Sequence, residues 1–364
     1  MKKIYYITAV FATLFLVGCG DGIDLPGVNV ETDLNKIPLP DNNVNLEQVE
    51  LKPSTEPMLH EGLHTEEDFQ RIRDKKAAGE EPWVSAYQLL VESQFSQKTA
   101  DTYPTEWIKR GVSGDENYMN AARGATIAYQ QALRWKIEQD DEYAAKAVEN
   151  LNKWVQTCVG VTGNTNLSLA AGLYGYEFAI AGELLRDYGG WDRADFAAFQ
   201  NWLLKVFYPA NDDFLKRHHD TNALHYWANW CLCNIAAKMA IGIVTDRRDI
   251  YNEGIAHLQT GDTNGRLRRA IYHDYAPDYN FAQWQESGRD QGHTLMCVGL
   301  MGIICQLAWS QGDDFFAYDD NLFLRACEYA ACCNYTNETV PYTTYIWQKQ
   351  SQWGYPIPEE QTTL

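Results

Sequence analysis

Apolar residues recur every three or four positions along most of the chain from about residue 65 onward. This spacing places one side chain per turn on the same face of an α-helix. Within residues 117–140 the apolar positions include Met119, Ala122, Ile127 and Leu133. The same spacing predicts further helices over residues 142–159, 167–188, 193–208, 226–245, 249–258, 294–311 and 321–335.

Local signals and loop composition complete this picture. Thr65, followed directly by three acidic residues, predicts the N-cap of a first helix, and Pro209 is expected to end the helix over 193–208. Alternating strand patterns are nearly absent. Short Gly/Asn/Asp loops make successive helices antiparallel hairpins. Seven or more such helices predict an all-α protein, an α/α toroid built as an incomplete barrel of helical hairpins. A regular solenoid is the weaker alternative, since no exact repeat is visible.

The first nineteen residues, MKKIYYITAVFATLFLVGC, combine two lysines, an apolar stretch and a terminal cysteine. This pattern is typical of a secretory signal rather than of a membrane span. The ending Leu16–Cys19 resembles a bacterial lipobox, which implies cleavage before Cys19 and a lipid on its thiol. An ordinary signal with an incidental cysteine is the alternative. We therefore expect a protein lipid-anchored in the bacterial cell envelope, at the periplasmic or surface face of the outer membrane.

Residues 20–56 are rich in Pro, Asn, Asp and Val without a sustained period, which predicts a flexible tether. The remaining residues, 57–364, are long enough to bury one core and are expected to form one domain.

The net charge of −19 excludes nucleic acid as a partner, because nucleic-acid binding requires a basic surface. An acidic ligand would need a local cationic site. The nine cysteines lack the spacing of zinc ligands, as in Cys231–Cys233 and Cys332–Cys333. We therefore expect no metal and no cofactor, with the cysteines acting as core residues or as disulfides.

Aromatic residues are abundant, with 12 Trp, 22 Tyr and 13 Phe. In the segment that begins at Tyr226 and contains Trp227 and Trp230, aromatic and amide groups alternate. Sugars present apolar ring faces edged with hydroxyl groups, which match such a surface. About half of the tryptophans are instead expected to pack helices together.

Histidines and arginines gather in one part of the chain. Six of the eight histidines lie between residues 218 and 293, and the same stretch contains Arg266, Arg268, Arg269 and Arg289. Together they supply the local cationic site that an acidic ligand needs, although single arginines could belong to a solvated helix face. Tyr272 lies between Arg269 and His273, and cations at these positions would lower the pKa of its phenol.

Three segments carry a resemblance to a known family: RHHDTNALHYWANWCLCN (217–234), RRAIYHD (268–274) and QWQESGRDQGHT (283–294). With residues 60–75 and 120–137, they resemble the alginate-lyase superfamily of polysaccharide lyases over most of residues 60–345. The resemblance implies an α/α toroid with a deep groove and metal-independent β-elimination of an acidic polysaccharide or oligosaccharide.

β-Elimination requires that the uronate carboxylate be neutralised while a base removes the adjacent C5 proton. By position, the resemblance implies Tyr272 as a proton shuttle, and His225 and Asn229 as base and neutraliser. Those two are four residues apart, on one face of the helix expected from residue 226. Arg289 and His293 would complete the carboxylate clamp. Further expected sugar contacts are Trp227, Trp230, Asn222, His218, Arg269, Gln285 and Glu286, the last of which would also orient a basic side chain.

Two departures from the family pattern indicate a divergent branch. The Asn-Asn-His triplet before the aromatic pair is replaced by Asn222-Ala223-Leu224-His225, and the match at Tyr272 is offset by one residue. Alginate, glucuronan or another uronate polymer therefore remain open as substrates. The chain also ends without a closing helix at residues 356–364, where relatives continue, which leaves room for a truncated or shortened groove.

Two other functions compete with a lyase. A glycoside hydrolase would use a carboxylate pair such as Glu286 and Asp290, but hydrolases normally take their pair from separate elements. A lipid-anchored glycan-binding protein, or an inactive lyase relative, would need the tryptophans but not the concentration of His, Arg and Tyr. The sequence therefore favours a polysaccharide lyase.

Overall fold

A computed structural model describes residues 54–336, 339–348 and 354–357 of the chain. The predicted signal peptide, its lipidation site Cys19 and nearly all of the predicted tether lie outside the described residues. The predicted Thr65 N-cap is confirmed, because its side chain and that of Asp68 form a reciprocal capping box.

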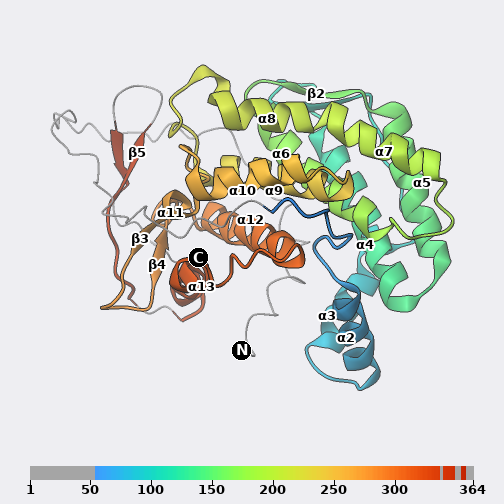
Figure 1. The fold of residues 1–364 in the computed structure, drawn as a ribbon, viewed down its shortest axis with the longest axis horizontal. Helices are drawn as coiled ribbons and strands as arrows, with labels where there is room; N and C mark the ends of the chain where they lie inside the picture. The colour runs from blue at the N-terminus through green and yellow to red at the C-terminus, as the bar shows by residue number, and fades with distance from the viewer. Residues whose placement is uncertain (1–53, 337–338, 349–353, 358–364) are drawn as a thin grey trace.

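The described chain is mainly helical, as predicted (Figure 1). Its α-helices are α2 (Glu66–Ala77), α3 (Trp83–Glu92), α4 (Tyr118–Glu138), α5 (Asp141–Thr157), α6 (Leu167–Leu184), α7 (Arg193–Val206), α8 (Tyr208–Arg217), α9 (Ala228–Val244), α10 (Arg248–Thr260), α11 (Leu267–Ala270), α12 (Gln291–Ser310) and α13 (Tyr318–Ala331). Single turns of other helix types follow at Gln94–Ser96, His218–Asp220 and Cys332–Thr336.

Three pairs of short strands join the helices. β1 (Trp107–Arg110) runs parallel to β2 (Gly160–Gly163). β3 (Ile271–Asp274) is antiparallel to β4 (Ala282–Trp284), and β5 (Tyr345–Gln348) is antiparallel to β6 (Gly354–Ile357). Each strand has only three or four residues, which is too short for an alternating pattern to stand out in the sequence.

The core is a row of neighbouring inner helices, α4, α6, α9 and α12, with α5, α8, α10 and α13 packed outside them. α9 and α12 are buried on most sides, which explains their nearly continuous apolar sequences. At Gly172 an added Cβ would lie 2.5 Å from Cys233 Sγ, so glycine is what allows α6 to approach α9. This arrangement of inner and outer helical hairpins is the predicted α/α toroid.

The inner helices begin at one end of the toroid. Parallel strands β1 and β2 lead into α4 and α6. Ser168, in the first turn of α6, has its Oγ 3.0 Å from His219 Nε2, and the His219 ring centroid is 5.7 Å from that of Tyr226, just before α9. Gln285 Oε1, shortly before α12, accepts a hydrogen bond of 2.8 Å from the first backbone N–H of α9, that of Ala228. We call the surface at these four helix starts the amino-end face.

Two of the helix boundaries that differ from the prediction have a clear physical reason. Pro209 does not close a helix but lies in the first turn of α8, where its missing N–H has no intrahelical partner to lose. α9 begins at Ala228 rather than at Tyr226, because Trp227 has an extended backbone. His225 therefore lies outside α9, and the prediction that it shares a helical face with Asn229 is wrong.

α12 is long and apolar enough to cross a membrane by length and composition, and 56% of its apolar window is buried inside the protein. It packs against α9 and α13, as expected of a core helix. The eight cysteines within the described residues are free thiols, and five of them are buried in the main core: Cys158, Cys231, Cys233, Cys297 and Cys305.

Glu177 of α6 is half-buried, and its Oε2 is a buried atom without a hydrogen-bond partner among the described residues. Burial raises its pKa to about 8. A carboxyl group with a raised folded pKa destabilises the fold once it ionises, so stability should fall as pH rises from about 4.5 to about 8.

Glu177→Gln is therefore expected to raise the free energy of unfolding by about 1–3 kcal/mol at pH 8 and to change it little at pH 4. Urea unfolding of both proteins at the two pH values checks this. Equal stability at pH 8 would show that the ionised carboxylate is solvated.

Candidate active site

Three aromatic rings from distant parts of the chain form a small cluster apart from the main core. Trp227 precedes α9, Tyr272 lies in β3 and Tyr345 begins β5. The ring centroid of Tyr345 is 5.7 Å from that of Trp227 and 5.0 Å from that of Tyr272. Trp230 packs against this aromatic cluster from the first turn of α9. Sequence analysis named Trp227, Tyr272 and Trp230 but missed Tyr345.

Arg289 connects the aromatic cluster to the charged stretch before α12. Its guanidinium lies 4.5 Å from the ring centroid of Trp227, in a cation–π contact. The guanidinium also forms an ion pair with Glu286, whose side chain is fully buried, whereas the Arg289 side chain is 21% exposed. Trp227 and Glu286 therefore hold the guanidinium in place while part of it stays accessible to an anionic ligand.

His293 and Asp290 form a second pair at the start of α12. Asp290 is the N-cap, and its Oδ1 accepts a hydrogen bond of 3.0 Å from the His293 backbone N–H. Its Oδ2 lies 3.1 Å from His293 Nδ1. Burial acts to raise the pKa of Asp290, but hydrogen bonds and charge from His293 outweigh it and lower the pKa. An ionised Asp290 favours the tautomer with its proton on Nδ1, in which Nε2 is the basic ring nitrogen.

The four inner helices have no acidic residue in their first turns, although α12 has the carboxylate of Asp290 as its N-cap. Five other helices, α2, α5, α7, α10 and α13, do have one or more, whereas the outer helix α8 has none. Helix starts carry partial positive charge. In a protein of net charge −19, the amino-end face therefore combines the positive ends of α4, α6 and α9 with Arg289 and is suited to an anionic ligand.

Tyr272 is covered rather than open. It is 3% exposed, and its hydroxyl donates to the backbone carbonyls of Thr343 and Thr344 at 2.9 and 2.6 Å. Burial, with smaller effects from Tyr275 and Tyr342, raises the pKa of Tyr272 well above its usual value. The prediction that nearby cations lower this pKa is therefore wrong, and Tyr272 is a protonated hydrogen-bond donor in this structure.

Tyr272→Phe is expected to lower the free energy of unfolding by about 1–2 kcal/mol, because the variant loses the hydrogen bond that the hydroxyl proton shares between the carbonyls of residues 343 and 344. Thermal unfolding measures this effect, and product formation is followed in parallel. Loss of activity by more than a hundredfold in a folded variant would instead assign a proton-transfer role to the hydroxyl.

The segment Pro341–Tyr345, which we call the strap, is distant from Tyr272 in the sequence but contacts it, β4 and the stretch before α12. Gln283 of β4 donates to the Thr343 carbonyl and accepts from its N–H, both at 2.9 Å. Tyr342 donates to the Ser287 carbonyl at 3.3 Å and packs on Gly288, whose φ is +81°. Sequence analysis missed the strap, since its only signal is two tyrosines without helical spacing.

Several other predicted residues are buried and already bonded. Asn229 is 1% exposed; its Oδ1 accepts from the Trp230 N–H and its Nδ2 lies 3.5 Å from Met296 Sδ of α12. Gln285 is 1% exposed and caps α9 as described above. His218 is 2% exposed and its ring centroid lies 4.8 Å from that of Phe214. These three side chains position the site's helices, and in this structure they have little surface to offer a sugar.

The remaining predicted residues lie nearer the surface. Asn222 is exposed, and its Oδ1 accepts from the Leu224 N–H in a local turn. His225 is half-buried, with its ring 4.7 Å from that of Tyr226. Arg269 is half-buried beside Arg266, and burial followed by repulsion from Arg266 lowers its pKa. Arg268, between them, is instead ion-paired with Asp319.

Glu286 and Asp290, the two carboxyl groups considered for hydrolysis, each bind a basic side chain. Glu286 is bonded to Arg289, and Asp290 to His293. Neither is a free carboxyl group facing the other across a substrate, as hydrolysis of a glycosidic bond requires.

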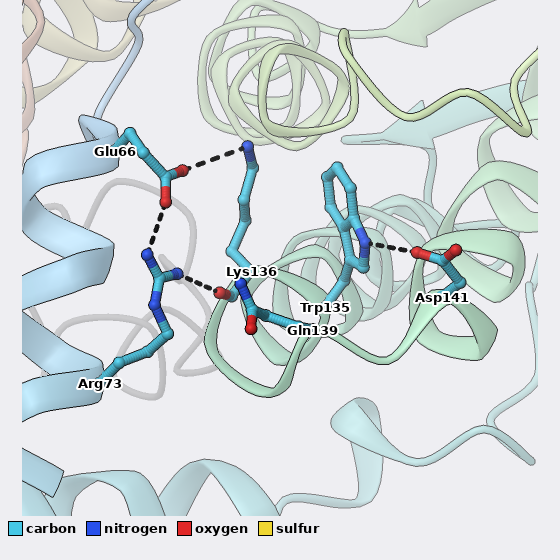
Figure 2. A pocket seen from close by; sticks show the side chains of 6 residues that line it. All are labelled: Glu66, Arg73, Trp135, Lys136, Gln139 and Asp141. Carbon is cyan, nitrogen blue, oxygen red and sulfur yellow. Dashed lines mark hydrogen bonds and ion pairs between the residues drawn. The ribbon is translucent and has the colours of Figure 1, made fainter. Parts of the chain in front are cut away.

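A pocket at the opposite end of α4 is lined by Glu66, Arg73, Trp135, Lys136, Gln139 and Asp141 (Figure 2). Its charged groups satisfy one another: Glu66 pairs with Arg73 at 2.6 Å and with Lys136 at 3.7 Å. Trp135 Nε1 donates to Asp141 at 3.0 Å. It contains none of the residues predicted from the sequence. Within the described ranges, no group of three or more His, Cys, Asp or Glu side chains is placed to hold a metal ion.

Comparisons with known proteins agree with this picture. The family model described as alginate lyase matches residues 72–338. No curated protein matches the sequence. The structure is similar to alginate lyase A1-III from Sphingomonas species A1, with a TM-score of 0.52 and 13% identity over 76% of this chain and 79% of that chain. It is also similar to an alginate lyase from Bacteroides ovatus, with a TM-score of 0.55 and 15% identity over 74% of this chain and 82% of that chain.

Proposed function

This chain belongs to the alginate lyase family of polysaccharide lyases, and from that premise we propose that it cleaves a uronate-containing glycan by β-elimination at the amino-end face. The observation that carries the proposal is the pairing of His293 with Asp290 next to Arg289 at the start of α12. An alginate lyase of similar structure has been solved with a tetrasaccharide, which supports an oligosaccharide or polysaccharide substrate here.

The first chemical requirement is to neutralise the uronate carboxylate. The C5 proton lies next to this carboxylate, whose negative charge opposes a second one at C5. Arg289 offers a guanidinium that Trp227 and Glu286 hold in position, and a guanidinium binds a carboxylate with two parallel hydrogen bonds. Prepositioned donors of this kind stabilise charge that develops in the transition state.

The second requirement is a base. His293, with its Nδ1 held by Asp290, removes the C5 proton through Nε2. The electron pair of the C5–H bond forms the C4–C5 double bond, and the C4–O glycosidic bond breaks. The leaving oxygen takes a proton, which the protonated His293 can return, so that the residue ends the cycle neutral.

The test of this function is ultraviolet absorbance of the unsaturated product. A soluble form lacking residues 1–19 is incubated with alginate, polymannuronate, polyguluronate, glucuronan and a neutral glucan as control. Growth of the conjugated-alkene band on one uronate polymer, with none on the glucan, is the expected result and names the substrate. A flat trace on every polymer with retained binding to one of them would indicate a glycan-binding protein or an inactive relative.

The cellular location is a separate proposal. The ending of the first nineteen residues supports lipidation of Cys19 and anchoring in the cell envelope. The wild-type chain, expressed in a bacterium with radiolabelled palmitate, should incorporate label and sediment with membranes. Cys19→Ala should do neither, and label in that variant would rule out Cys19 as the modified residue.

A further inference from the structure

Arg110, the last residue of β1, is a buried arginine without an acidic partner among the described residues. It is 4% exposed and lies on the same inward side of the strand as Ile108. Its guanidinium lies 4.7 Å from the ring centroid of Tyr118, the first residue of α4. Its Nη1 is buried without a hydrogen-bond partner in the described part of the chain. An unpaired buried charge is costly, so this group calls for an anion.

The nearest carboxylates, in the loop after Arg110, are bound elsewhere: Glu116 Oε1 accepts a hydrogen bond of 2.6 Å from the Gly111 N–H, and Asp115 pairs with Lys109. Neither α4 nor α6 has a side-chain cap or an acidic residue in its first turn. Asn117, at the N-cap of α4, binds β1 instead: its Oδ1 accepts from the Lys109 N–H at 2.7 Å and its Nδ2 donates to the Trp107 carbonyl at 3.0 Å. The start of α4 therefore remains available to an anion, together with the guanidinium.

The other buried arginines each have an acidic partner, which Arg110 lacks among the described residues. Arg134 pairs with Glu138, Arg186 with Glu183 and Arg325 with Asp274. The chain has 49 acidic residues against 30 lysines and arginines, so carboxylates are not scarce. The lack of one at Arg110 leaves a site that a carboxylate from outside the protein can fill.

Arg110 lies on the same amino-end face as Arg289, but before α4, which is separated from α12 by α6 and α9 in the row of inner helices. An added Cβ at Gly111 would lie 1.9 Å from Asn164 Oδ1, so the end of β1 touches the loop before α6. Ser168, in the first turn of α6, has its Oγ 3.0 Å from His219 Nε2, and the His219 ring centroid is 5.7 Å from that of Tyr226, which directly precedes Trp227. A polymer that places one carboxylate on Arg289 would therefore extend along this face with further carboxylates.

We propose that Arg110 is a second carboxylate-binding site, which holds a uronate unit other than the one whose bond is cleaved. The proposal rests on the proposed function and deepens it: the enzyme would recognise several consecutive acidic sugars rather than one. Arg123 of α4, half-buried over the ring of Tyr103 and without an ion pair in the described residues, lies on the same helix and adds positive charge.

The experiment compares Arg110→Met with the wild type on a trisaccharide and a hexasaccharide of the uronate polymer that is cleaved. Loss of a charged hydrogen-bonding partner is expected to raise KM for the hexasaccharide by about tenfold to a hundredfold. The KM for the trisaccharide and kcat for both should change little. Arg247→Met is the matched control, because Arg247 follows the opposite end of α9 and its side chain is 48% exposed.

Thermal unfolding separates a ligand site from a structural role. Without substrate, Arg110→Met should unfold at or above the wild-type temperature, because it removes an unpaired buried charge. A clearly lower temperature, or an equal change in KM for both oligosaccharides, or no change in either, would overturn the proposal.

The subsite can be tested even if the proposed function fails. If the wild type gives no unsaturated product, the rise in unfolding temperature with hexasaccharides of each uronate replaces the kinetic comparison. A rise in the wild type that disappears in Arg110→Met supports the site without lyase activity. Equal rises in both proteins, or none in either, contradict it.

Discussion

His293→Gln is expected to lower kcat/KM on the cleaved polymer by roughly 10²–10⁴-fold, the usual contribution of a general base. Gln keeps a hydrogen-bonding group of similar reach but cannot take a proton at neutral pH. The His293 side chain is 22% exposed, so the variant should fold and unfold like the wild type. Initial rates of alkene formation, together with thermal unfolding, measure both effects.

Asp290→Asn tests whether the carboxylate positions His293. Asn is as good an N-cap as Asp, so the variant keeps the cap of α12 and loses only the charge beside Nδ1. We expect a smaller loss than for His293→Gln, and no additional loss when the two changes are combined, because residues that act as a unit are not additive.

His60→Gln is the matched control for His293→Gln. His60 also pairs with an aspartate, Asp246, at 3.0 Å, but its side chain is 54% exposed and Asp246 lies at the opposite end of the inner helices. Activity should be unchanged. An equal loss in both histidine variants, or a loss of less than about tenfold in His293→Gln, would remove His293 from the mechanism.

Replacing Arg289 and Glu286 together, as Arg289→Met with Glu286→Gln, is expected to lower kcat/KM by roughly 10²–10³-fold while leaving the protein folded. The loss reflects the missing neutralisation of the uronate carboxylate. The paired change is needed because Arg289→Met alone leaves the fully buried Glu286 without its cation, at a cost of roughly 3–5 kcal/mol in stability.

Arg289→Lys separates charge from geometry. Lysine keeps the positive charge but not the planar pair of donors, so its activity should lie between that of the wild type and that of the double variant. The matched pair Arg186→Met with Glu183→Gln removes a buried ion pair of the same spacing at the other end of α6. The folded fraction of that protein should retain wild-type kcat/KM. An equal loss of kcat/KM in the two double variants would mean that both lower activity by disturbing the fold.

Local spacing accounts for much of what could be predicted. The helical periodicity identified most of the helices, and Thr65 with Asp68 was recognisable as a cap because both partners lie within one turn. The pairs Glu286–Arg289 and Asp290–His293 are each three residues apart, a separation that backbone geometry brings together. The two pairs in the charged stretch before α12 were therefore within reach of a prediction from the sequence.

Contacts between distant segments could not be predicted in this way. Gln285 caps α9 from 57 residues away, and the strap covers Tyr272 from 71 residues away. No periodicity links such pairs. They decided that Gln285 and Asn229 are buried and that Tyr272 is a protonated donor rather than an activated base.

The sequence by itself determined the helical class, the family and the types of residue available for the chemistry, because these depend on local spacing and composition. Only the tertiary structure decided which charges are paired and which are not. It enclosed Glu286 with Arg289, surrounded Tyr272 with backbone carbonyls and left Arg110 without a carboxylate. Desolvation and pairing are properties of the packed environment, and that environment is built from residues far apart in the chain.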